Sequence, residues 1–325
     1  MRVFGWQADT AGCAWWRILE PFKELAARGH QVGHSPTYSA DWDDADTILG
    51  QRTCMPAPTG RWQQWARAGR HLVYDLDDDL FSVELTAPNG GFFARSDVRE
   101  RILRNAAAAA RVTVCSERLA EVMSRHHADV QVVPNGVPAE LLNWTPTPRG
   151  DRFTIGWAGT PSTLPELALA ARPMRRFVDR NPEAELHTLG LDQRAIGRTP
   201  LRGARLRCTP AIADPLGYLA AVDFHVWVAP YRSTPFNRAK APTKALEAAA
   251  LGVPIIASDI EPYRRHIEHG VTGLLVRQDH EWEAYLRLLA TDEDLRLSMG
   301  EAARKQARQH TTAAIAPLWE KALTP

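Results

Sequence analysis

The chain alternates short apolar runs with amphipathic stretches along most of its length. The runs "MRVFGW", "HLVY", "RVTV" and "VQVVP", and later "FTIGWA", "AELHTLG", "FHVWVAP" and "VPIIAS", have the length of buried strands. Between such runs apolar residues recur at helical spacing, as at Ile18, Leu19, Phe22, Leu25 and Ala26. Repeated strand–helix alternation predicts an α/β protein with parallel sheets and helices on both faces.

Capping residues predict where two of the helices begin or end. Ser116 precedes the stretch "ERLAEVMSRHH" and is typical of an N-cap. In "PTKALEAAALG", Pro242 suits a first helical turn, and Gly252 suits the position just past the helix end. We therefore expect a helix from about Pro242 to Leu251.

A single stretch interrupts the alternation and predicts a domain boundary. Residues 143–152, "NWTPTPRGDR", combine two prolines, a glycine and polar side chains, as linkers do. We expect two Rossmann-like domains, residues 1–145 and 146–325. In open parallel sheets ligands bind beyond the carboxyl ends of the strands, so we expect a site in the cleft between the domains.

Composition and charge narrow the function classes. The 325 residues are 45% hydrophobic and 24% charged, with a formal net charge of +1, so no overall field attracts nucleic acid or anionic membranes. Four widely spaced cysteines, without a Cys-x-x-Cys pair, disfavour a disulfide framework or a structural zinc site. No apolar run suggests a signal peptide or a membrane span, so we expect a cytoplasmic protein.

The start of the helix after Pro242 carries the clearest chemical signal. Arg238, Lys240 and Lys244 bring positive charge to its amino end, where Thr243 and free backbone N–H groups could seat a phosphate. Glu247 lies three residues after Lys244, on the same helix face. A carboxylate can accept hydrogen bonds from both hydroxyls of a ribose. The pattern predicts a nucleoside diphosphate site; the alternative is a Lys–Glu pair on a helix surface.

Two loops are expected to face this site. In "WAGTPST", Gly159 and Thr160 would offer backbone N–H groups and a hydroxyl to the β-phosphate. In "DTAGCAWWR", Gly12 permits close backbone approach and Arg17 can bind a phosphate with two parallel hydrogen bonds. These residues complete the set expected to bind the donor.

Several stretches resemble the family 4 retaining glycosyltransferases of group 1. They are "RAKAPTKALEAAALGVPIIASDIEPYRRHIEHGVTGLLV", "AAVDFHVWVAPY" and, to a lesser extent, "VQVVPNGV". Enzymes of this family have the GT-B fold, with two Rossmann-like domains facing each other across a cleft. The resemblance implies that residues 1–145 form the acceptor-side domain and residues 146–325 the nucleotide-sugar-binding domain. The resemblance implies that Glu247 holds the ribose and that Lys244 and Lys240 hold the diphosphate, without a metal. It also implies that the last helix, about residues 311–323, packs back on the first domain.

Two departures from the family pattern accompany this resemblance. Ala239 stands where the family often has a glutamate, and "GWAGTPS" replaces the usual Gly-Arg…Lys diphosphate pair. These departures keep open a non-catalytic binder of nucleotide sugars or glycans. A sugar-nucleotide epimerase on the same fold is a further alternative.

The acidic run in "YDLDDDLF" has two readings. A strand followed by Asp-x-Asp is the metal signature of single-domain GT-A glycosyltransferases. We instead expect Asp77 or Asp78 to bind hydroxyls of the donor sugar or the acceptor, with Asp77 counted as catalytic beside Lys240 and Lys244. An exposed acidic turn is the remaining alternative.

The expected activity is transfer of a hexosyl group from a UDP- or GDP-sugar to an acceptor, with retention of anomeric configuration. The resemblance implies that the leaving phosphate itself helps to deprotonate the acceptor. The acceptor class stays open among glycans, lipid-linked sugars, proteins, metabolites and modified nucleic-acid bases. The arginines between Arg95 and Arg104 leave an anionic acceptor open as well.

Overall fold

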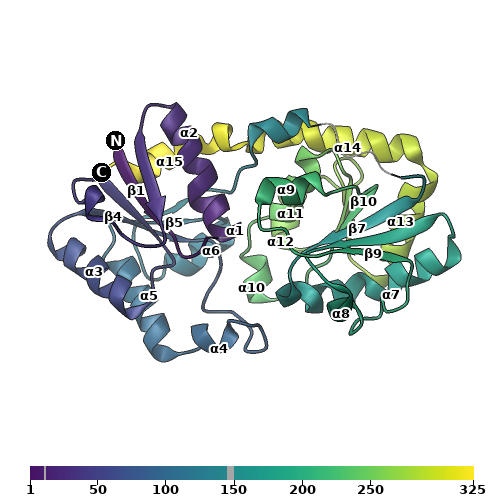
Figure 1. Ribbon diagram of the computed structural model, residues 1–325, viewed down its shortest axis with the longest axis horizontal. Helices are drawn as coiled ribbons and strands as arrows, with labels where there is room; N and C mark the ends of the chain where they lie inside the picture. Colours follow the sequence, from purple (N-terminus) through teal and green to yellow (C-terminus); the bar gives the residue numbers. More distant parts are fainter. Residues whose placement is uncertain (11, 145–149) are drawn as a thin grey trace. The chain divides into compact units, whose positions relative to one another are not determined.

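The protein forms two compact α/β units, each built on its own sheet (Figure 1). The structure is a computed structural model that describes residues 1–10, 12–144 and 150–325, so half of the expected linker, residues 145–149, lies outside the described residues. The first unit comprises Met1–Pro138, Arg238–Ala241 and His310–Pro325, and the second comprises Ala139–Asn237 and Pro242–Gln309. Both units are Rossmann-like, as the strand–helix alternation predicted.

The first unit contains a six-stranded sheet in the order β2-β1-β3-β4-β5-β6, with parallel pairing throughout. The strand order reverses between β1 and β3, which marks the topological switch point of this sheet. The strands are β1 (Arg2–Trp6), β2 (Gln31–Ser35), β3 (Thr47–Gln51), β4 (His71–Leu76), β5 (Arg111–Val114) and β6 (Val130–Val132).

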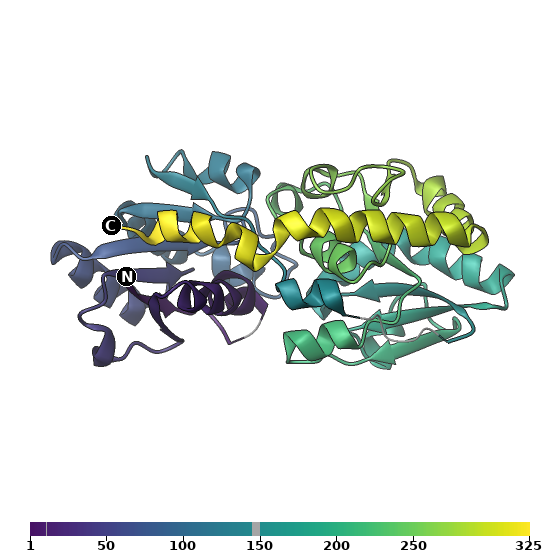
Figure 2. The same cartoon turned by 90° about the horizontal axis from the view of Figure 1, so that it is seen from above.

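Helices cover both faces of this sheet. Ser116 caps α6 as predicted, since its hydroxyl accepts a hydrogen bond from the Leu119 N–H at 3.2 Å. The last helix, α15, belongs to this unit and lies beside α2 (Figure 2). The helical segments are α1 (Gly12–Ala14), a π-helix (Trp15–Leu19), α2 (Glu20–Ala27), a 3-10 turn (Ala40–Trp42), α3 (Pro56–Arg67), α4 (Gly90–Phe93), α5 (Ser96–Ala107), α6 (Glu117–Met123) and α15 (Thr312–Leu323).

A buried ion pair ties the ends of the chain to this sheet. Arg17, with 0% exposure, donates from Nη2 to Asp75 Oδ1 at 2.7 Å, and its Nη1 donates to the Val133 carbonyl at 2.5 Å and to Asn135 Oδ1 at 3.0 Å. The guanidinium carbon lies 4.7 Å from the ring centroid of Trp319 in α15. Because both charges are paired and hydrogen-bonded, their burial is tolerated.

The second unit has a sheet in the order β12-β11-β10-β7-β8-β9, again parallel throughout, and its strand order reverses between β7 and β10. The strands are β7 (Phe153–Ala158), β8 (Ala184–Leu189), β9 (Leu206–Thr209), β10 (Val226–Ala229), β11 (Ile255–Ser258) and β12 (Leu274–Val276).

Helices α7 and α13 pack against each other over one hydrophobic core that includes Trp157, Met174 and Leu286. The helices are α7 (Leu164–Arg180), α8 (Gln193–Ile196), α9 (Pro215–Ala220), α10 (Pro235–Arg238), α11 (Thr243–Ala250), α12 (Glu261–Arg264), α13 (Asp279–Thr291) and α14 (Glu293–Ala307), with 3-10 turns at Ala139–Asn143, Pro161–Thr163 and Arg308–His310. Within the described residues, no helix is long and apolar enough to cross a membrane.

Replacing Arg17 with Met should strongly destabilise the first unit. The substitution strands the fully buried Asp75 carboxylate without a counter-charge, and breaking a buried pair in this way costs about 3–5 kcal/mol. Urea denaturation followed by tryptophan fluorescence measures the loss. As a control, Arg265→Met removes an arginine that is 55% exposed in its side chain, and the denaturation midpoint should not change. Equal midpoints for the two variants would contradict the importance of the buried pair.

Candidate functional site

Helix α11 places the predicted donor-binding side chains in the second unit. It runs from Thr243 to Ala250, with Pro242 at the N-cap, one residue later than expected. Gly252 takes a left-handed φ of +64°, which suits the position after a helix end. Ala245, Leu246, Ala248 and Ala250 are buried on the core side of the helix. The apolar residues of "TKALEAAAL" therefore anchor the helix, and its amino end carries the charged groups.

Glu247 is a buried carboxylate with few partners. It is 7% exposed, and its Oε2 accepts a hydrogen bond from the Tyr218 hydroxyl at 3.1 Å. Its Oε1 has no hydrogen-bond partner among the described residues. Burial raises the pKa of Glu247 to about 7, against the opposing effects of Lys244 and the Tyr218 hydroxyl. A buried carboxylate with a single neutral donor is under-satisfied, and it is suited to accept further hydrogen bonds from a ligand.

Lys244 lies against an aromatic pair at the start of the same helix. Its Nζ donates to the Tyr231 hydroxyl at 3.0 Å and lies 5.0 Å from the centroid of that ring. The Tyr231 and Tyr263 rings are stacked, with centroids 5.6 Å apart and planes 9° from parallel. In the described part of the chain Lys244 forms no ion pair. Its charge is therefore held in place by neutral groups and stays available to an anion.

A buried cluster around Glu166 fixes the loop that carries Tyr231. Glu166, in the first turn of α7, accepts hydrogen bonds from the Arg232 backbone N–H at 2.5 Å, from Arg232 Nη2 at 3.0 Å and from Asn237 Nδ2 at 3.0 Å. The cluster joins the start of α7, which follows β7, to the loop that follows β10. These loops follow the two strands at the switch point of the second sheet, where ligands bind in folds of this type.

The loop after β7 uses its backbone donors internally. The Gly159 N–H donates to the Leu189 carbonyl at 3.0 Å, and the Thr160 N–H donates to Thr163 Oγ1 at 3.1 Å. The N–H groups expected to bind the β-phosphate are therefore already engaged within the fold. Thr160 itself is exposed, and its hydroxyl shares a hydrogen bond with that of Ser162 at 2.6 Å.

A second cluster of charges lies in the first unit. Lys240 Nζ donates to Asp78 Oδ1 at 2.9 Å, and Arg52 Nη2 donates to Asp78 Oδ2 at 2.7 Å. Arg52 Nε is hydrogen-bonded to Asp77. Burial raises the pKa of Asp77, whereas Lys240 and Arg52 outweigh burial and lower the pKa of Asp78. The acidic run is thus largely shielded, with side-chain exposures of 11% and 19%, and is not an exposed turn.

The single-domain GT-A alternative does not fit the architecture. GT-A enzymes have a single domain, whereas this chain has two Rossmann-like units. Asp75 is also paired with Arg17, and Asp77 with Arg52. Among the described residues, no group of three or more His, Cys, Asp or Glu side chains is arranged to hold a metal ion.

The remaining residues predicted to bind the donor are Arg17, Gly12, Arg238 and Thr243, and their environments in the structure differ from one another. Arg17 was expected to bind a phosphate, but its guanidinium is fully buried and paired with Asp75, so we assign it a structural role instead. Gly12 begins α1, and a Cβ placed there meets no atom within 4 Å, so packing does not require glycine. Arg238 keeps a buried Nε without a hydrogen-bond partner among the described residues. Thr243 is half-buried at the first position of α11.

Sequence reasoning missed four residues that shape these clusters. Tyr231 follows the recognised strand "FHVWVAP", and Glu166 occupies a first helical turn, where acidic residues are favoured. These positions gave a signal that could have been used. Tyr218 and Arg52 gave none, because their partners Glu247, Asp77 and Asp78 lie 25 or more residues away.

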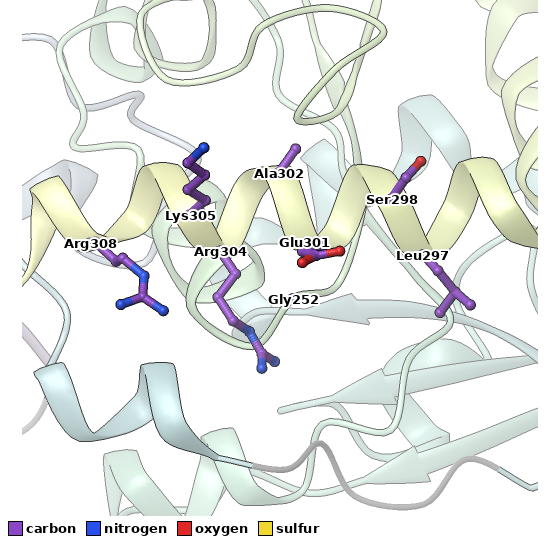
Figure 3. A pocket seen from close by; sticks show the side chains of 8 residues that line it. All are labelled: Gly252, Leu297, Ser298, Glu301, Ala302, Arg304, Lys305 and Arg308. Atoms are coloured by element: carbon purple, nitrogen blue, oxygen red, sulfur yellow. The ribbon is translucent and has the colours of Figure 1, made fainter.

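A further hollow of about 880 Å³ lies along α14 (Figure 3). Arg304 reaches from this helix to the Leu251 carbonyl at 2.6 Å, beside Gly252. Gly252 precedes β11, so this hollow lies near the amino end of that strand, away from the ligand-binding edge of the sheet. We assign it no role. It is lined by Gly252, Leu297, Ser298, Glu301, Ala302, Arg304, Lys305 and Arg308.

Part of the chain matches a known protein family. Residues 225–306 match the family model "Glycosyl transferases group 1", which covers β10, α11 and β11. Among curated relatives, D-inositol 3-phosphate glycosyltransferase of Corynebacterium jeikeium is 26% identical over 220 residues, 59% of this chain and 51% of the relative. The enzyme of that name from Jonesia denitrificans is 36% identical over 87 residues, 26% of this chain and 20% of the relative. The chain thus spans about half, or less, of the length of these relatives.

Solved structures share the fold at low sequence identity. Sucrose-phosphate synthase from Thermosynechococcus elongatus aligns with a TM-score of 0.71 at 16% identity, covering 99% of this chain and 98% of its own. HepE of Anabaena, solved in complex with UDP and glucose, aligns with a TM-score of 0.70 at 16% identity, covering 99% of each chain. At this identity the likeness establishes the fold, which is that of GT-B glycosyltransferases.

The raised pKa of Glu247 predicts a pH-dependent stability of the second unit. Between the ordinary glutamate pKa of 4.5 and about 7, the unfolded chain releases the proton while the folded chain retains it. Stability should therefore fall as pH rises through this window, by up to about 3 kcal/mol from Glu247 alone. Urea denaturation from pH 4.5 to 8 measures the change. Glu247→Gln should flatten this component, whereas Glu301→Gln, at an exposed position, should not; identical profiles for both variants and the parent would refute the assignment.

Proposed function

We propose that this chain, whose residues 225–306 are a glycosyl transferases group 1 domain within a GT-B fold, transfers a hexosyl group from a nucleotide diphosphate sugar to an acceptor. The observation that carries the proposal is the under-satisfied carboxylate of Glu247, one helical turn from the unpaired cation of Lys244. A ribose diol and a diphosphate, joined in one ligand, would satisfy both groups.

The ribose is proposed to bind at Glu247. Its Oε1 lacks a partner in the described structure, and Oε2 receives a single hydrogen bond, so the carboxylate can accept two hydroxyl donors. Each added hydrogen bond favours the ionised form, and binding should therefore lower the pKa from about 7. The Tyr218 hydroxyl would hold the carboxylate in orientation for both.

The diphosphate is proposed to bind at the amino end of α11. Lys244 supplies charge, the first N–H groups of the helix point toward the same end, and Thr243 adds a hydroxyl. Arg238 supports this placement, because its buried Nε lacks a partner among the described residues. Lys240 is retained as a proposed diphosphate ligand. It would have to exchange part of its contact with Asp78 for the donor. The Thr160 hydroxyl completes the proposed contacts.

In the chemical step the bond between the anomeric carbon and the phosphate oxygen breaks, and negative charge grows on the leaving diphosphate. Cations fixed before the reaction stabilise such charge at little reorganisation cost. The Lys244 ammonium is fixed in this way by Tyr231 and, through the Glu166 cluster, by the loop behind it. We propose retention of configuration without a metal, with the leaving phosphate receiving the acceptor proton and Asp77, whose pKa is raised, near the acceptor hydroxyls.

UDP-sugars are the first donors to test, because the HepE structure contains UDP, and GDP-sugars are the second. The purified protein is incubated with each donor, and products are separated by mass spectrometry. Release of nucleoside diphosphate supports transfer or slow donor hydrolysis. An altered sugar would instead identify an epimerase, and an unchanged donor with measurable affinity would identify a binding protein.

Glu247→Gln should weaken donor affinity about tenfold to 100-fold, because a hydrogen bond to a charged group contributes about 1.5–3 kcal/mol. Isothermal titration calorimetry with a UDP-sugar measures the affinity. The parent protein should bind more tightly at pH 8 than at pH 6, and the variant should lose this dependence. Glu301→Gln serves as the matched control. Unchanged affinity in Glu247→Gln would overturn the ribose assignment.

Lys244→Ala should lower kcat about 100-fold or more, as does the loss of one preorganised donor to a developing anion. The exposed Lys305 supplies the control variant Lys305→Ala, which should retain the parent kcat. Steady-state release of nucleoside diphosphate gives both values. A tenfold rise in KM with an unchanged kcat would assign Lys244 to ground-state binding alone.

A further inference from the structure

The first unit contains a pocket that the donor does not account for. Its volume is about 360 Å³, near the lower end of the range of small-molecule sites. It lies after the carboxyl ends of β1 and β3, where the strand order of this sheet reverses. It is lined by Trp6, Gln7, Ala8, Asp9, Pro36, Gln51, Arg52, Thr53, Cys54, Met55, Pro58, Asn89, Phe92 and Phe93.

One wall of the pocket is held in a strained and fixed conformation. Arg52 has a φ of +48°, and among the described residues no other non-glycine residue has a positive φ. Its backbone N–H donates to the Asp75 carbonyl at 2.9 Å. The next carbonyl, that of Thr53, accepts hydrogen bonds from the Tyr74 hydroxyl at 2.9 Å and from Asn105 Nδ2 at 2.8 Å. This wall is therefore formed before any ligand binds.

Two arginines of α5 form hydrogen bonds with the backbone of the pocket walls. Arg101 Nε donates to the Cys54 carbonyl at 2.6 Å. Arg99 Nε donates to the Phe93 carbonyl at 2.9 Å, which holds the end of α4. Both carbonyls belong to residues that line the pocket. The arginines between Arg95 and Arg104 had suggested an anionic acceptor. Two of them, Arg99 and Arg101, instead stabilise the backbone of the pocket walls.

The charges at the pocket disfavour an anionic ligand. Its lining contains one cation, Arg52, and that guanidinium is hydrogen-bonded to both Asp77 and Asp78. The lining also contains the Asp9 carboxylate. Within this lining a phosphate would meet the Asp9 carboxylate and an arginine whose charge is already neutralised by Asp77 and Asp78, and like charges repel.

The uncharged lining fits a hydroxylated ring. Phe93 is half-buried and offers an apolar surface on which the C–H face of a sugar ring can pack, and Trp6 adds to the apolar lining. Gln51, 1% exposed, accepts the Ala8 N–H at 3.2 Å, and its Nε2 has no hydrogen-bond partner in the described structure. This unsatisfied donor lies on the wall of the pocket, and Asp9 supplies an acceptor for hydroxyls.

We infer that this pocket binds the acceptor, and that the acceptor presents an uncharged, hydroxylated ring there, such as an unphosphorylated sugar or cyclic polyol. The inference rests on the proposed transfer, because it names the class of molecule that receives the sugar. It also separates this chain from the curated relatives, whose names specify a phosphorylated inositol.

Ring binding is tested without a donor, by ligand-observed NMR. The probes are glucose, mannose, galactose and myo-inositol, each beside a phosphorylated counterpart. We expect a neutral ring to bind, and its phosphorylated counterpart to bind at least about tenfold more weakly. Absence of binding by all four neutral rings, or tighter binding of the phosphorylated forms, overturns the inference.

Met55→Trp tests the location of the binding. Met55 is 52% exposed at the pocket, so a larger side chain can obstruct the entrance without disturbing the core. Affinity for the neutral ring, and sugar transfer to it, should fall at least about tenfold. Leu297→Trp, at a position 55% exposed in α14, is the matched control and should change neither. Equal effects of the two variants would place the ring elsewhere and overturn the assignment.

Donor titration keeps the two proposals apart. Met55 lines the pocket and is not among the residues proposed to bind the donor, so Met55→Trp should leave the affinity for the UDP-sugar unchanged. If the parent protein fails to bind any nucleotide sugar but binds the ring in a Met55-dependent way, the proposed transfer and the acceptor role both fail, and only ring binding at this pocket is supported. If it binds donor but no ring, the pocket assignment fails alone.

Discussion

The buried pair of Arg17 and Asp75 is the constraint on which the first unit depends. Two fully buried charges are stable only when each is paired and hydrogen-bonded, and this requirement brings five segments together: the π-helix, β4, β5, the residues after β6 and α15. The same strand continues into Asp77 and Asp78, which the Arg52 side chain holds. Arg17 therefore holds the strand through Asp75, and Arg52 holds the acidic run that follows it through Asp77 and Asp78.

Buried charged groups in this protein differ in how fully they are hydrogen-bonded. All three guanidinium nitrogens of Arg17 and both carboxylate oxygens of Asp75 have partners, whereas Glu247 and Arg238 each retain an atom without one in the described residues. A buried polar network in which every atom has a hydrogen-bond partner stabilises the fold. A buried polar atom without a partner marks a position where a ligand could supply the missing hydrogen bond. This difference, more than charge alone, separates the residues proposed to bind from those that support the scaffold.

The sequence predicted the fold class because strand and helix periodicities are local properties. The α6 cap at Ser116 and the left-handed glycine at position 252 were likewise readable from a few neighbouring residues. Long-range pairings were not readable. Arg17 carries the features of a phosphate ligand, and only the position of Asp75 in space shows that its charge is already engaged. The pocket at Arg52 was missed for the same reason, since its walls come from separate loops.

The composition of the first unit has a consequence for how the chain is made. Its core includes Trp319 and Leu323, and residues 238–241 also belong to it, so it is assembled from three separate stretches of sequence. A nascent chain emerges amino end first, and this unit cannot close over Arg17 until α15 has left the ribosome. The second unit, although encoded later, has all its residues available earlier and can complete its fold first. A truncated amino-terminal fragment would lack α15, which covers Arg17. Exchanging the first unit between related proteins therefore requires exchanging all three stretches of sequence together.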